Sequence, residues 1–530
     1  MAHAIIFTDR APRRNVDLSH GYNPAFYSFP AGAYKLASVL REQGLDVLVV
    51  PNCLNLTFNG VKKIIEQNSK NLLWVGISST LMFMRSDQFD NYRNYWSSST
   101  EETMSINYFS EKFTLYSATA HEMAWSEHEL NLLAEYLDVP LLVGGGWITH
   151  MKNGTFSNLN ENVHLVRNYA EKYIEKFTAR RMSGITKNEP TSNVHYDNNE
   201  FKESKILWKD TDLISPDDWL PLEVARGCAF NCAYCTYPHK GKFDQFKDPK
   251  VLREELIRNY EHFGVTNYIL MDDLYNDSKT KVRVLHDEVW NNLPFKPEWS
   301  SYMRLDMFWS DPESIDIVKA SGARMGTFGI ETLDNRAGKS VGKGLGKERI
   351  LETLGWMKEK WGHDVLIQGN FIAGLPYETR ESIHDTLEWT KNTDLMFAAS
   401  WFPMWITPPA HYDIVEDAEI NRISRDVDKW EIKWLDKQNW INSAGITYNE
   451  VDKLCLDFVN QNKVGGLSSR VSFSFVDYAD LRTAGLSHQD ILNSRYKNTD
   501  AEFIVLNNAL KKVGQRVDAR IKKILAIKDT

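Results

Sequence analysis

The sequence lacks several features that would place a protein in a common class. No run of about 18 apolar residues occurs among its 530 residues, so we expect no membrane-spanning helix. Its start has no basic region followed by a long apolar segment, so we expect no secretory signal and a cytoplasmic location. Cysteine is scarce, and three of the five cysteines are clustered, which favours a metal site in a reducing compartment over a disulfide framework.

An excess of positive charge is also missing. The formal net charge is −9, which argues against an extensive nucleic-acid interface, so we expect nucleic acid to be an unlikely partner. Apolar residues make up 42% of the chain, which is enough to bury more than one core. The length and composition therefore predict a protein of two or three domains.

Residues 1–165 alternate between strand and helix patterns. The apolar periodicity predicts strands at 4–8, 45–50, 72–77 and 140–143 and helices at 31–43, 61–67 and 126–137. This alternation is typical of a doubly wound parallel α/β domain, in which ligands bind at the carboxyl ends of the strands. The candidate ligand-binding residues at these ends are Ser78, Ser79, Gly144, Gly145 and Gly146.

Residues 166–215 carry a charged helical pattern at 169–181 and then polar sequence, and we interpret them as a linker. The alternation resumes over 216–407 and predicts a partial (β/α)6 barrel. Its predicted strands are 222–225, 267–271, 298–303, 325–330, 365–372 and 396–402. Polar residues close most of these strands, where the reacting groups of such barrels lie. These candidates are Asp272, Asp273, Ser301, Arg304, Glu331 and Gln368, together with Gly374 in a following turn.

Residues 408–530 predict a mostly helical C-terminal domain. A basic amphipathic pattern predicts a helix from about 501 to 527. Trp430 and Trp434 are spaced one helical turn apart, and we interpret them as a packing stripe rather than a substrate surface.

The three clustered cysteines follow the first predicted barrel strand as Cys228, Cys232 and Cys235. Three thiolates at this CxxxCxxC spacing can bind three irons of a 4Fe-4S cluster and leave the fourth iron open. His239 follows at a spacing that also allows a closed structural Cys3His zinc site. A zinc site needs no barrel around it, so the polar strand ends downstream favour the cluster.

This cysteine loop resembles that of the radical S-adenosylmethionine (SAM) superfamily, with Tyr234 at the position of its usual aromatic residue. The resemblance extends over two segments that are similar to the cobalamin-type subgroup, namely Phe328–Thr332 through Val341–Gly344, and Phe371–Thr379. It implies that Cys228, Cys232 and Cys235 hold the cluster and that SAM binds across the strand ends. Asp272 and Asp273 would then accept from the SAM ammonium, Ser301, Arg304 and Glu331 would hold its carboxylate or ribose, and Tyr234 and the Gly374 turn would face its adenine.

The N-terminal domain resembles the cobalamin-binding domain that precedes many radical SAM barrels, through Gly21–Pro24 and Val143–His150. The DxHxxG signature of cobalamin domains that ligate cobalt through histidine is absent. The resemblance implies reductive cleavage of SAM to a 5′-deoxyadenosyl radical and cobalamin-dependent methylation of an unactivated carbon. It also implies a small-molecule or peptide substrate and an external reductant such as flavodoxin or ferredoxin.

Two alternatives stay open. A radical SAM enzyme without cobalamin would catalyse a rearrangement, oxidation, ring closure or sulfur insertion. A noncatalytic protein would hold a cluster or zinc on the same loop.

Overall fold

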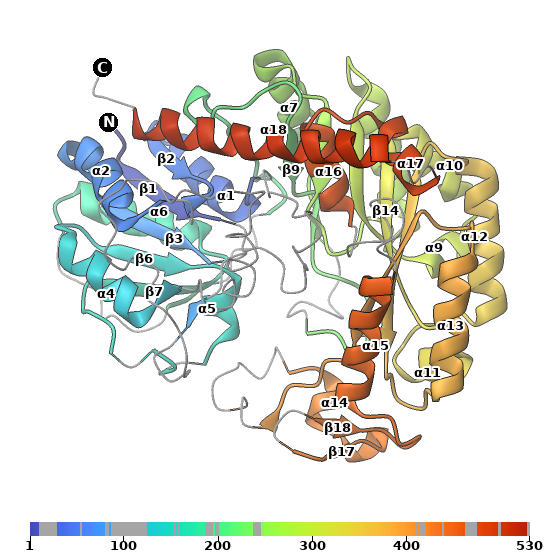
Figure 1. Cartoon of the computed structure of the whole chain (residues 1–530). Helices are drawn as coiled ribbons and strands as arrows, with labels where there is room; N and C mark the ends of the chain where they lie inside the picture. Colours follow the sequence, from blue (N-terminus) through green and yellow to red (C-terminus); the bar gives the residue numbers. More distant parts are fainter. Residues whose placement is uncertain are drawn as a thin grey trace. The chain divides into compact units, whose positions relative to one another are not determined.

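The computed structural model describes most of the chain, namely residues 1–9, 29–53, 56–79, 84–85, 125–152, 154–156, 158–185, 194–196, 201–236, 245–409, 412, 420–436, 439–461, 474–496 and 500–526. Two compact units can be separated (Figure 1). The first comprises residues 1–200, 204–215 and 507–530, and the second comprises 201–203 and 216–506. Among the helices of the described residues, none combines the length and apolar composition needed to span a bilayer.

The first unit contains a six-stranded parallel sheet of order β2-β1-β3-β6-β7-β8. The strands are β1 (Ala4–Thr8), β2 (Val47–Val50), β3 (Trp74–Ser78), β6 (Leu141–Gly144), β7 (Val163–Asn168) and β8 (Val194–Tyr196). The helices are α1 (Ala31–Arg41), α2 (Phe58–Asn68), α4 (Glu127–Tyr136), α5 (Gly146–His150) and α6 (Glu171–Met182). The predicted doubly wound α/β fold is therefore present.

Helices cover both faces of this sheet because successive strand residues point to opposite faces. Val75 and Ile77 of β3 share a core with Ile64 of α2 and Leu133 of α4. On the other face, the indole of Trp74 donates a hydrogen bond to Thr178 of α6 at 2.9 Å.

The segment that we predicted to be a linker is largely part of the first unit. Residues 163–168 form β7 and 171–182 form α6, while 204–215 also belong to this unit. Asp212 anchors the last piece through a bidentate ion pair with Arg41 of α1, at 2.7 Å for both contacts, and both side chains are buried. The sequence did not indicate this because β7 is short and is buried through its pairing with β6.

The second unit contains a parallel six-stranded sheet of order β16-β15-β14-β13-β12-β9, as the partial barrel requires. The strands are β9 (Trp219–Leu222), β12 (Asn267–Leu270), β13 (Glu298–Met303), β14 (Ala323–Glu331), β15 (Leu366–Ala373) and β16 (Ala398–Pro403). The helices that follow them include α7 (Pro249–Phe263), α8 (Lys279–Val284), α9 (Leu305–Ser310), α10 (Glu313–Ala320), α11 (Asn335–Ser340), α12 (Lys347–Trp361) and α13 (Arg380–Asn392). The first barrel strand lies three residues earlier than predicted. Residues 225–226 instead form β10, which pairs antiparallel with β11 (Gln245–Phe246).

Local sequence explains where the barrel helices begin and end. Asp248 caps α7 by accepting from the backbone N–H of Lys250, with Pro249 at the first helical position, and Gly264 ends the helix at a φ of 71°. Thr379 and Ser382 form a capping box at the start of α13.

The inner face of the barrel sheet is recognised by its contacts with helix α16 (Phe475–Thr483). The Ser300 hydroxyl donates to the Phe475 carbonyl at 3.1 Å, and the Tyr302 and Phe475 rings lie 4.6 Å apart. Trp299, which directly precedes Ser300 and so lies on the opposite face, donates to the carbonyl of Ser321 at the end of α10. Inward positions on β13 are thus Ser300 and Tyr302, and the next one beyond the strand is Arg304.

The C-terminal region is mostly helical, as predicted. Its helices are α14 (Arg422–Arg425), α15 (Tyr448–Gln461), α16, α17 (His488–Tyr496) and α18 (Asp500–Leu525). Trp430 and Trp434 do not share a helix, however. Trp430 ends a short 3-10 turn and Trp434 lies in β17 (Lys433–Trp434), which pairs with β18 (Trp440–Ile441). A left-handed Glu431, with a φ of 55°, breaks the predicted helix between them.

Candidate active site

The cysteine loop follows β10, and backbone contacts hold it against the segment that follows α11. The Ala233 N–H donates to the carbonyl of Val341 at 2.9 Å, and Gly342 follows at a φ of 88°. A Cβ on Gly342 would lie 3.8 Å from the Cα of Cys232, so the two backbones pass close together. Arg422 of α14 also donates to the carbonyl of Asn231. The loop is therefore positioned by segments more than 100 residues downstream.

The three cysteines on this loop form no disulfide, and Cys232 is buried while Cys228 and Cys235 are partly buried. Burial raises the pKa of Cys228 to about 11. In the described part of the chain, no three His, Cys, Asp or Glu side chains are gathered as a set of metal ligands. The three-thiolate site therefore stays a prediction. It rests on the residue types and their spacing, which suit an iron-sulfur cluster.

Arg304, at the end of β13, contacts a cysteine and an aromatic ring of this loop. Its Nη1 lies 3.4 Å from the sulfur of Cys232, and its guanidinium lies 3.7 Å from the centre of the Phe230 ring. Its Nε and Nη2 form a bidentate ion pair with Asp306 at 2.8 and 2.6 Å. Although burial disfavours the charge of Arg304, Asp306 raises its pKa further above the usual value. The pair therefore stays ionised.

Three residues form a second polar cluster at the end of β14. The hydroxyl of Tyr234 donates to Glu331 at 2.7 Å, and the ammonium of Lys343 lies 3.2 Å from the same carboxylate oxygen. Lys343 also donates to the carbonyl of Gly329 at 2.7 Å. Glu331 adopts a φ of 69°, a strained left-handed conformation for a non-glycine residue that is typical of functional sites. The predicted residues Tyr234 and Glu331 are thus brought together, with burial and the Glu331 charge raising the pKa of Tyr234.

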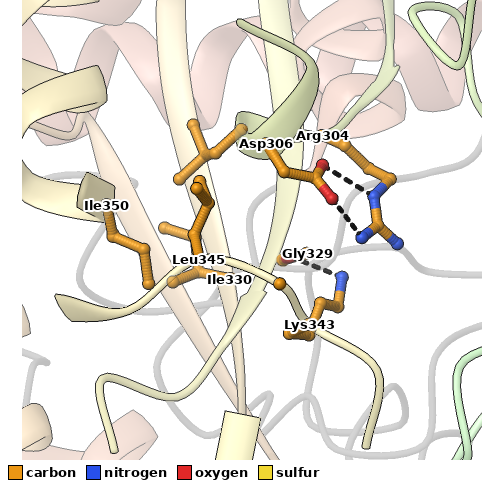
Figure 2. Close-up of a pocket in the computed structure, with 9 residues that line it drawn as sticks. Arg304, Asp306, Gly329, Ile330, Lys343, Leu345 and Ile350 are labelled. Carbon is orange, nitrogen blue, oxygen red and sulfur yellow. Dashed lines mark hydrogen bonds and ion pairs between the residues drawn. The ribbon is translucent and has the colours of Figure 1, made fainter. Parts of the chain in front are cut away.

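A pocket lies where these two clusters approach the outer helices (Figure 2). Figure 2 shows the Arg304 and Asp306 pair and the Lys343 side chain on one side, and apolar Ile350 on the other. The residues that line this pocket are Arg304, Leu305, Asp306, Gly329, Ile330, Lys343, Gly344, Leu345 and Ile350. It offers charged groups of both signs beside an apolar wall.

Asp272 has a different position from the one that we predicted. Its Oδ1 accepts from the backbone N–H groups of Val224 and Ala225, at 2.7 Å each, so it holds the chain that leads into the cysteine loop. Its Oδ2 is buried without a hydrogen-bond partner in the described part of the chain. Burial raises the pKa of Asp272 to about 7. Asp273 follows it and is half-buried.

Ser301 is not brought to the barrel interior. It alternates with Ser300 and Tyr302, which contact α16, so it lies on the helix-covered face of β13. Its hydroxyl donates to the neighbouring Tyr302 carbonyl. Its side chain therefore does not face the barrel mouth beside Arg304, because successive strand residues point to opposite faces.

Gln368 does lie on the inner face, in register with Thr327, which accepts from the Phe475 N–H. Its amide donates to Ser400 at 3.0 Å and to Asn370 at 2.6 Å, so it belongs to a polar row across β15 and β16. The Gln368 carbonyl oxygen is buried without a hydrogen-bond partner in the described residues.

The turn that follows β15 is fixed by Glu378, to which the sequence analysis gave no role. One oxygen of its buried carboxyl accepts from the N–H groups of Gly374 and Leu375 at 2.9 Å each, and the other accepts from the Thr332 hydroxyl at 2.6 Å. Gly374 has a φ of 87°, and a Cβ there would lie 2.5 Å from the Trp440 ring. A larger residue at this turn would clash with Trp440, so the position requires glycine. The backbone N–H of Gly374 donates to Glu378.

Comparison with known families identifies this barrel. Residues 222–390 match the model of the radical SAM superfamily. This part of the chain is a radical SAM domain. The matched range includes the cysteine loop, Arg304 and the Tyr234, Glu331 and Lys343 cluster.

Curated relatives share this radical SAM domain over part of their length. An uncharacterized methyltransferase of Pyrococcus horikoshii is 28% identical over 34% of this chain and 39% of the relative. The anaerobic magnesium-protoporphyrin IX monomethyl ester cyclase of Cereibacter sphaeroides is 24% identical over 40% of this chain and 37% of the relative. The bacteriochlorophyllide d C-8(2)-methyltransferase of Chlorobaculum tepidum is 24% identical over 33% of this chain and 40% of the relative. The matches thus span about two fifths of the length of these relatives.

A solved structure resembles the fold of nearly the whole chain. The cobalamin-dependent SAM radical enzyme OxsB, with aqua-cobalamin bound, aligns with a TM-score of 0.52 and 12% identity. The alignment covers 99% of this chain and 83% of OxsB. The combination of an α/β unit and a radical SAM domain is therefore one that a known structure also has.

The five predicted residues of the first unit lie at the ends of β3 and β6. Ser78 is in register with Gly144, and the Ser79 N–H donates to the Gly144 carbonyl at 2.7 Å. Gly145 adopts a φ of 107° and Gly146 begins α5. The Ser79 hydroxyl is buried without a hydrogen-bond partner in the described part of the chain, which is a site that a bound ligand can satisfy. Gly21–Pro24 and His239 lie outside the described residues.

Sequence reasoning missed Asp306, Phe230 and Glu378 as parts of the radical SAM domain site. Asp306 follows Arg304 by two positions at the start of α9, a helix that the apolar pattern did not predict. Glu378 stands in the turn segment already noted for its resemblance, four residues after Gly374. A carboxylate placed just after a glycine turn is a signal that it accepts from the turn's N–H groups.

Proposed function

We propose that this protein is a radical SAM enzyme that uses cobalamin to methylate an unactivated carbon of its substrate. The observation that carries the proposal is the arrangement in the radical SAM domain, where the cysteine loop meets the Arg304 pair and the Tyr234, Glu331 and Lys343 cluster. The fold likeness of the whole chain to OxsB, described as cobalamin-dependent, supports the cobalamin part. Two methyltransferases among the relatives support the reaction class.

Cys228, Cys232 and Cys235 would hold a 4Fe-4S cluster, and the strand ends of the first unit at Ser78, Ser79 and Gly144–Gly146 would hold cobalamin. When bound, the cluster supplies the electron that cleaves SAM to a 5′-deoxyadenosyl radical, and cobalamin supplies the methyl group. A carbon without a lone pair cannot attack SAM directly, which is the physical reason for joining these cofactors.

The chain's own residues would bind and orient SAM. Lys343 carries the charge that suits its carboxylate, and the Tyr234 ring offers a flat apolar surface beside the cysteine loop. Glu331 places both groups, since it accepts from the Tyr234 hydroxyl and pairs with Lys343. Asp273 and the free oxygen of Asp272 are acceptors for an ammonium group. The electron would come from an external donor of the flavodoxin or ferredoxin type, and a cytoplasmic location stays a prediction.

Cobalamin is tested by its absorption. Protein isolated from cobalamin-supplemented cells should retain a corrin with its characteristic visible bands. Substituting Gly145, which has a φ of 107°, by valine should lower the retained corrin because a branched side chain strains this turn. Gly184→Val is the control, since Gly184 follows the end of α6 with a positive φ of 73°, and a Cβ there meets nothing within 4 Å. Retention of no corrin by the wild type would contradict the cobalamin part.

A radical SAM reaction without cobalamin is the second candidate. The relative named as an anaerobic cyclase, which matches 40% of this chain, favours ring closure with oxidation. A wild type that cleaves SAM but retains no corrin would support this candidate.

A further inference from the structure

Each nitrogen of the Arg304 guanidinium already has a partner within the protein. Nε and Nη2 are occupied by Asp306, and Nη1 points to the sulfur of Cys232 at 3.4 Å. The flat face lies 3.7 Å from the centre of the Phe230 ring. Only 7% of the residue is exposed. Arg304 is thus committed to the cysteine loop rather than open to a SAM carboxylate, the role that the sequence suggested.

The position of Arg304 is also fixed from its backbone. Its N–H donates to the side-chain oxygen of Asn276 at 2.8 Å, and the Asn276 amide donates back to its carbonyl at 2.9 Å. Asp306 lies in the first turn of α9, so the helix holds the carboxylate that orients the guanidinium. Because the bidentate pair with Asp306 occupies Nε and Nη2, the remaining nitrogen, Nη1, faces the thiol of Cys232.

We propose that Arg304 is a positioning residue that raises the reduction potential of the cluster by donating an N–H to the sulfur of Cys232. The proposal rests on the proposed function, because it requires a cluster on Cys232. One-electron reduction adds negative charge to the cluster and its thiolates. A hydrogen bond to a ligating sulfur and a nearby positive charge both stabilise that added charge, so the reduced form gains more than the oxidised form.

The test is a redox titration of the cluster in the anaerobically reconstituted full chain, with dithionite as the one-electron donor and electron paramagnetic resonance as the readout. Arg304→Met removes the charge and the donors but keeps a long side chain. At a fixed potential we expect at least a tenfold lower ratio of reduced to oxidised cluster, which corresponds to a potential lower by about 59 mV for one electron. Arg304→Lys keeps the charge, so its shift should be smaller.

Arg283→Met is the matched control. Arg283 forms a similar bidentate pair with Asp311 in the same unit, at 2.5 and 2.9 Å, without a cysteine contact. Its cluster should titrate as the wild type does. An unchanged potential in Arg304→Met, with a full complement of cluster, would overturn the proposal, as would an equal shift in Arg283→Met.

A second measurement has its decisive readout in the wild type. Wild-type protein labelled with ¹⁵N-arginine should show a nitrogen coupling to the reduced cluster in pulsed electron paramagnetic resonance, and Arg304→Lys should lose that coupling. No coupling in a cluster-bearing wild type overturns the role of Arg304 and leaves the proposed function standing. A wild type that binds no 4Fe-4S cluster after reconstitution overturns both.

Discussion

Asp272 and Glu378 are buried carboxyl groups that hold the loops of the barrel mouth. Each accepts two backbone N–H groups, from Val224 and Ala225 in one case and from Gly374 and Leu375 in the other. Neither arrangement is visible from residue type, because acidic residues at the ends of barrel strands also bind ligands. The strand ends thus contain residues that shape the site as well as residues that face it.

The pKa of Glu378 predicts a pH dependence of stability. Burial raises this pKa from 4.5 to about 8, so the folded protein keeps a proton that the unfolded chain releases. The free energy of unfolding should therefore fall as pH rises from about 4.5 to about 8. Glu378→Gln, which cannot ionise, should flatten this part of the profile.

Urea unfolding of wild type and Glu378→Gln across this pH range measures the effect. The comparison is the difference between the two profiles, because Asp272, with a pKa raised to about 7, adds a similar slope to both proteins. Parallel profiles would show that Glu378 is ionised in the folded state at neutral pH.

Strand β14 and the segment after α11 pack closely together at Gly329. A Cβ on Gly329 would lie 2.4 Å from the carboxylate of Glu331 and 3.0 Å from the ammonium of Lys343. The sequence placed Glu331 at this strand end, but the close approach of Lys343 depends on how the chain returns after α11 to donate to the Gly329 carbonyl. That return is a tertiary contact, which strand and helix periodicity does not encode.

Gly329→Ala should weaken SAM binding while leaving the cluster in place. The added methyl group displaces Glu331 or Lys343, and a loss of one charge-assisted contact of about 1.5–3 kcal/mol lowers the affinity roughly tenfold or more. Isothermal titration of the reconstituted protein with SAM measures this change.

Gly355→Ala provides the control for that substitution. Gly355 lies within α12, and a Cβ there meets nothing within 4 Å. It should bind SAM as the wild type does and gain up to about 1 kcal/mol of stability, because alanine is the better helix former. If Gly329→Ala and Gly355→Ala bind SAM with equal affinity, the Glu331 and Lys343 cluster does not contribute to SAM binding.

The whole molecule shows which parts of the fold follow from sequence. Both parallel sheets were predicted in outline because most of their strands are short apolar runs, but β7 and β8 of the first sheet were not predicted. The division of the chain into its two units was harder to predict from the sequence. Residues 204–215 belong to the first unit through the buried pair of Arg41 and Asp212, which lie 171 positions apart. Such a long-range ion pair leaves no local pattern.

The carboxyl ends of both sheets carry the residues assigned to cofactors, which is where parallel α/β folds bind ligands. A known structure with 12% identity has a similar fold over 99% of this chain, and fold alone does not fix the reaction. The chemistry therefore has to be tested at the cysteine loop.

The most direct test is SAM cleavage by the anaerobically reconstituted full chain under dithionite, measured as 5′-deoxyadenosine formed together with the bound iron, sulfide and zinc. The account predicts a 4Fe-4S cluster and cleavage in the wild type. Cys232→Ala should lose both, while Cys455→Ala, which removes a buried free thiol outside the loop, should keep both. One zinc per chain without cleavage, or undiminished cleavage by Cys232→Ala, would contradict the account.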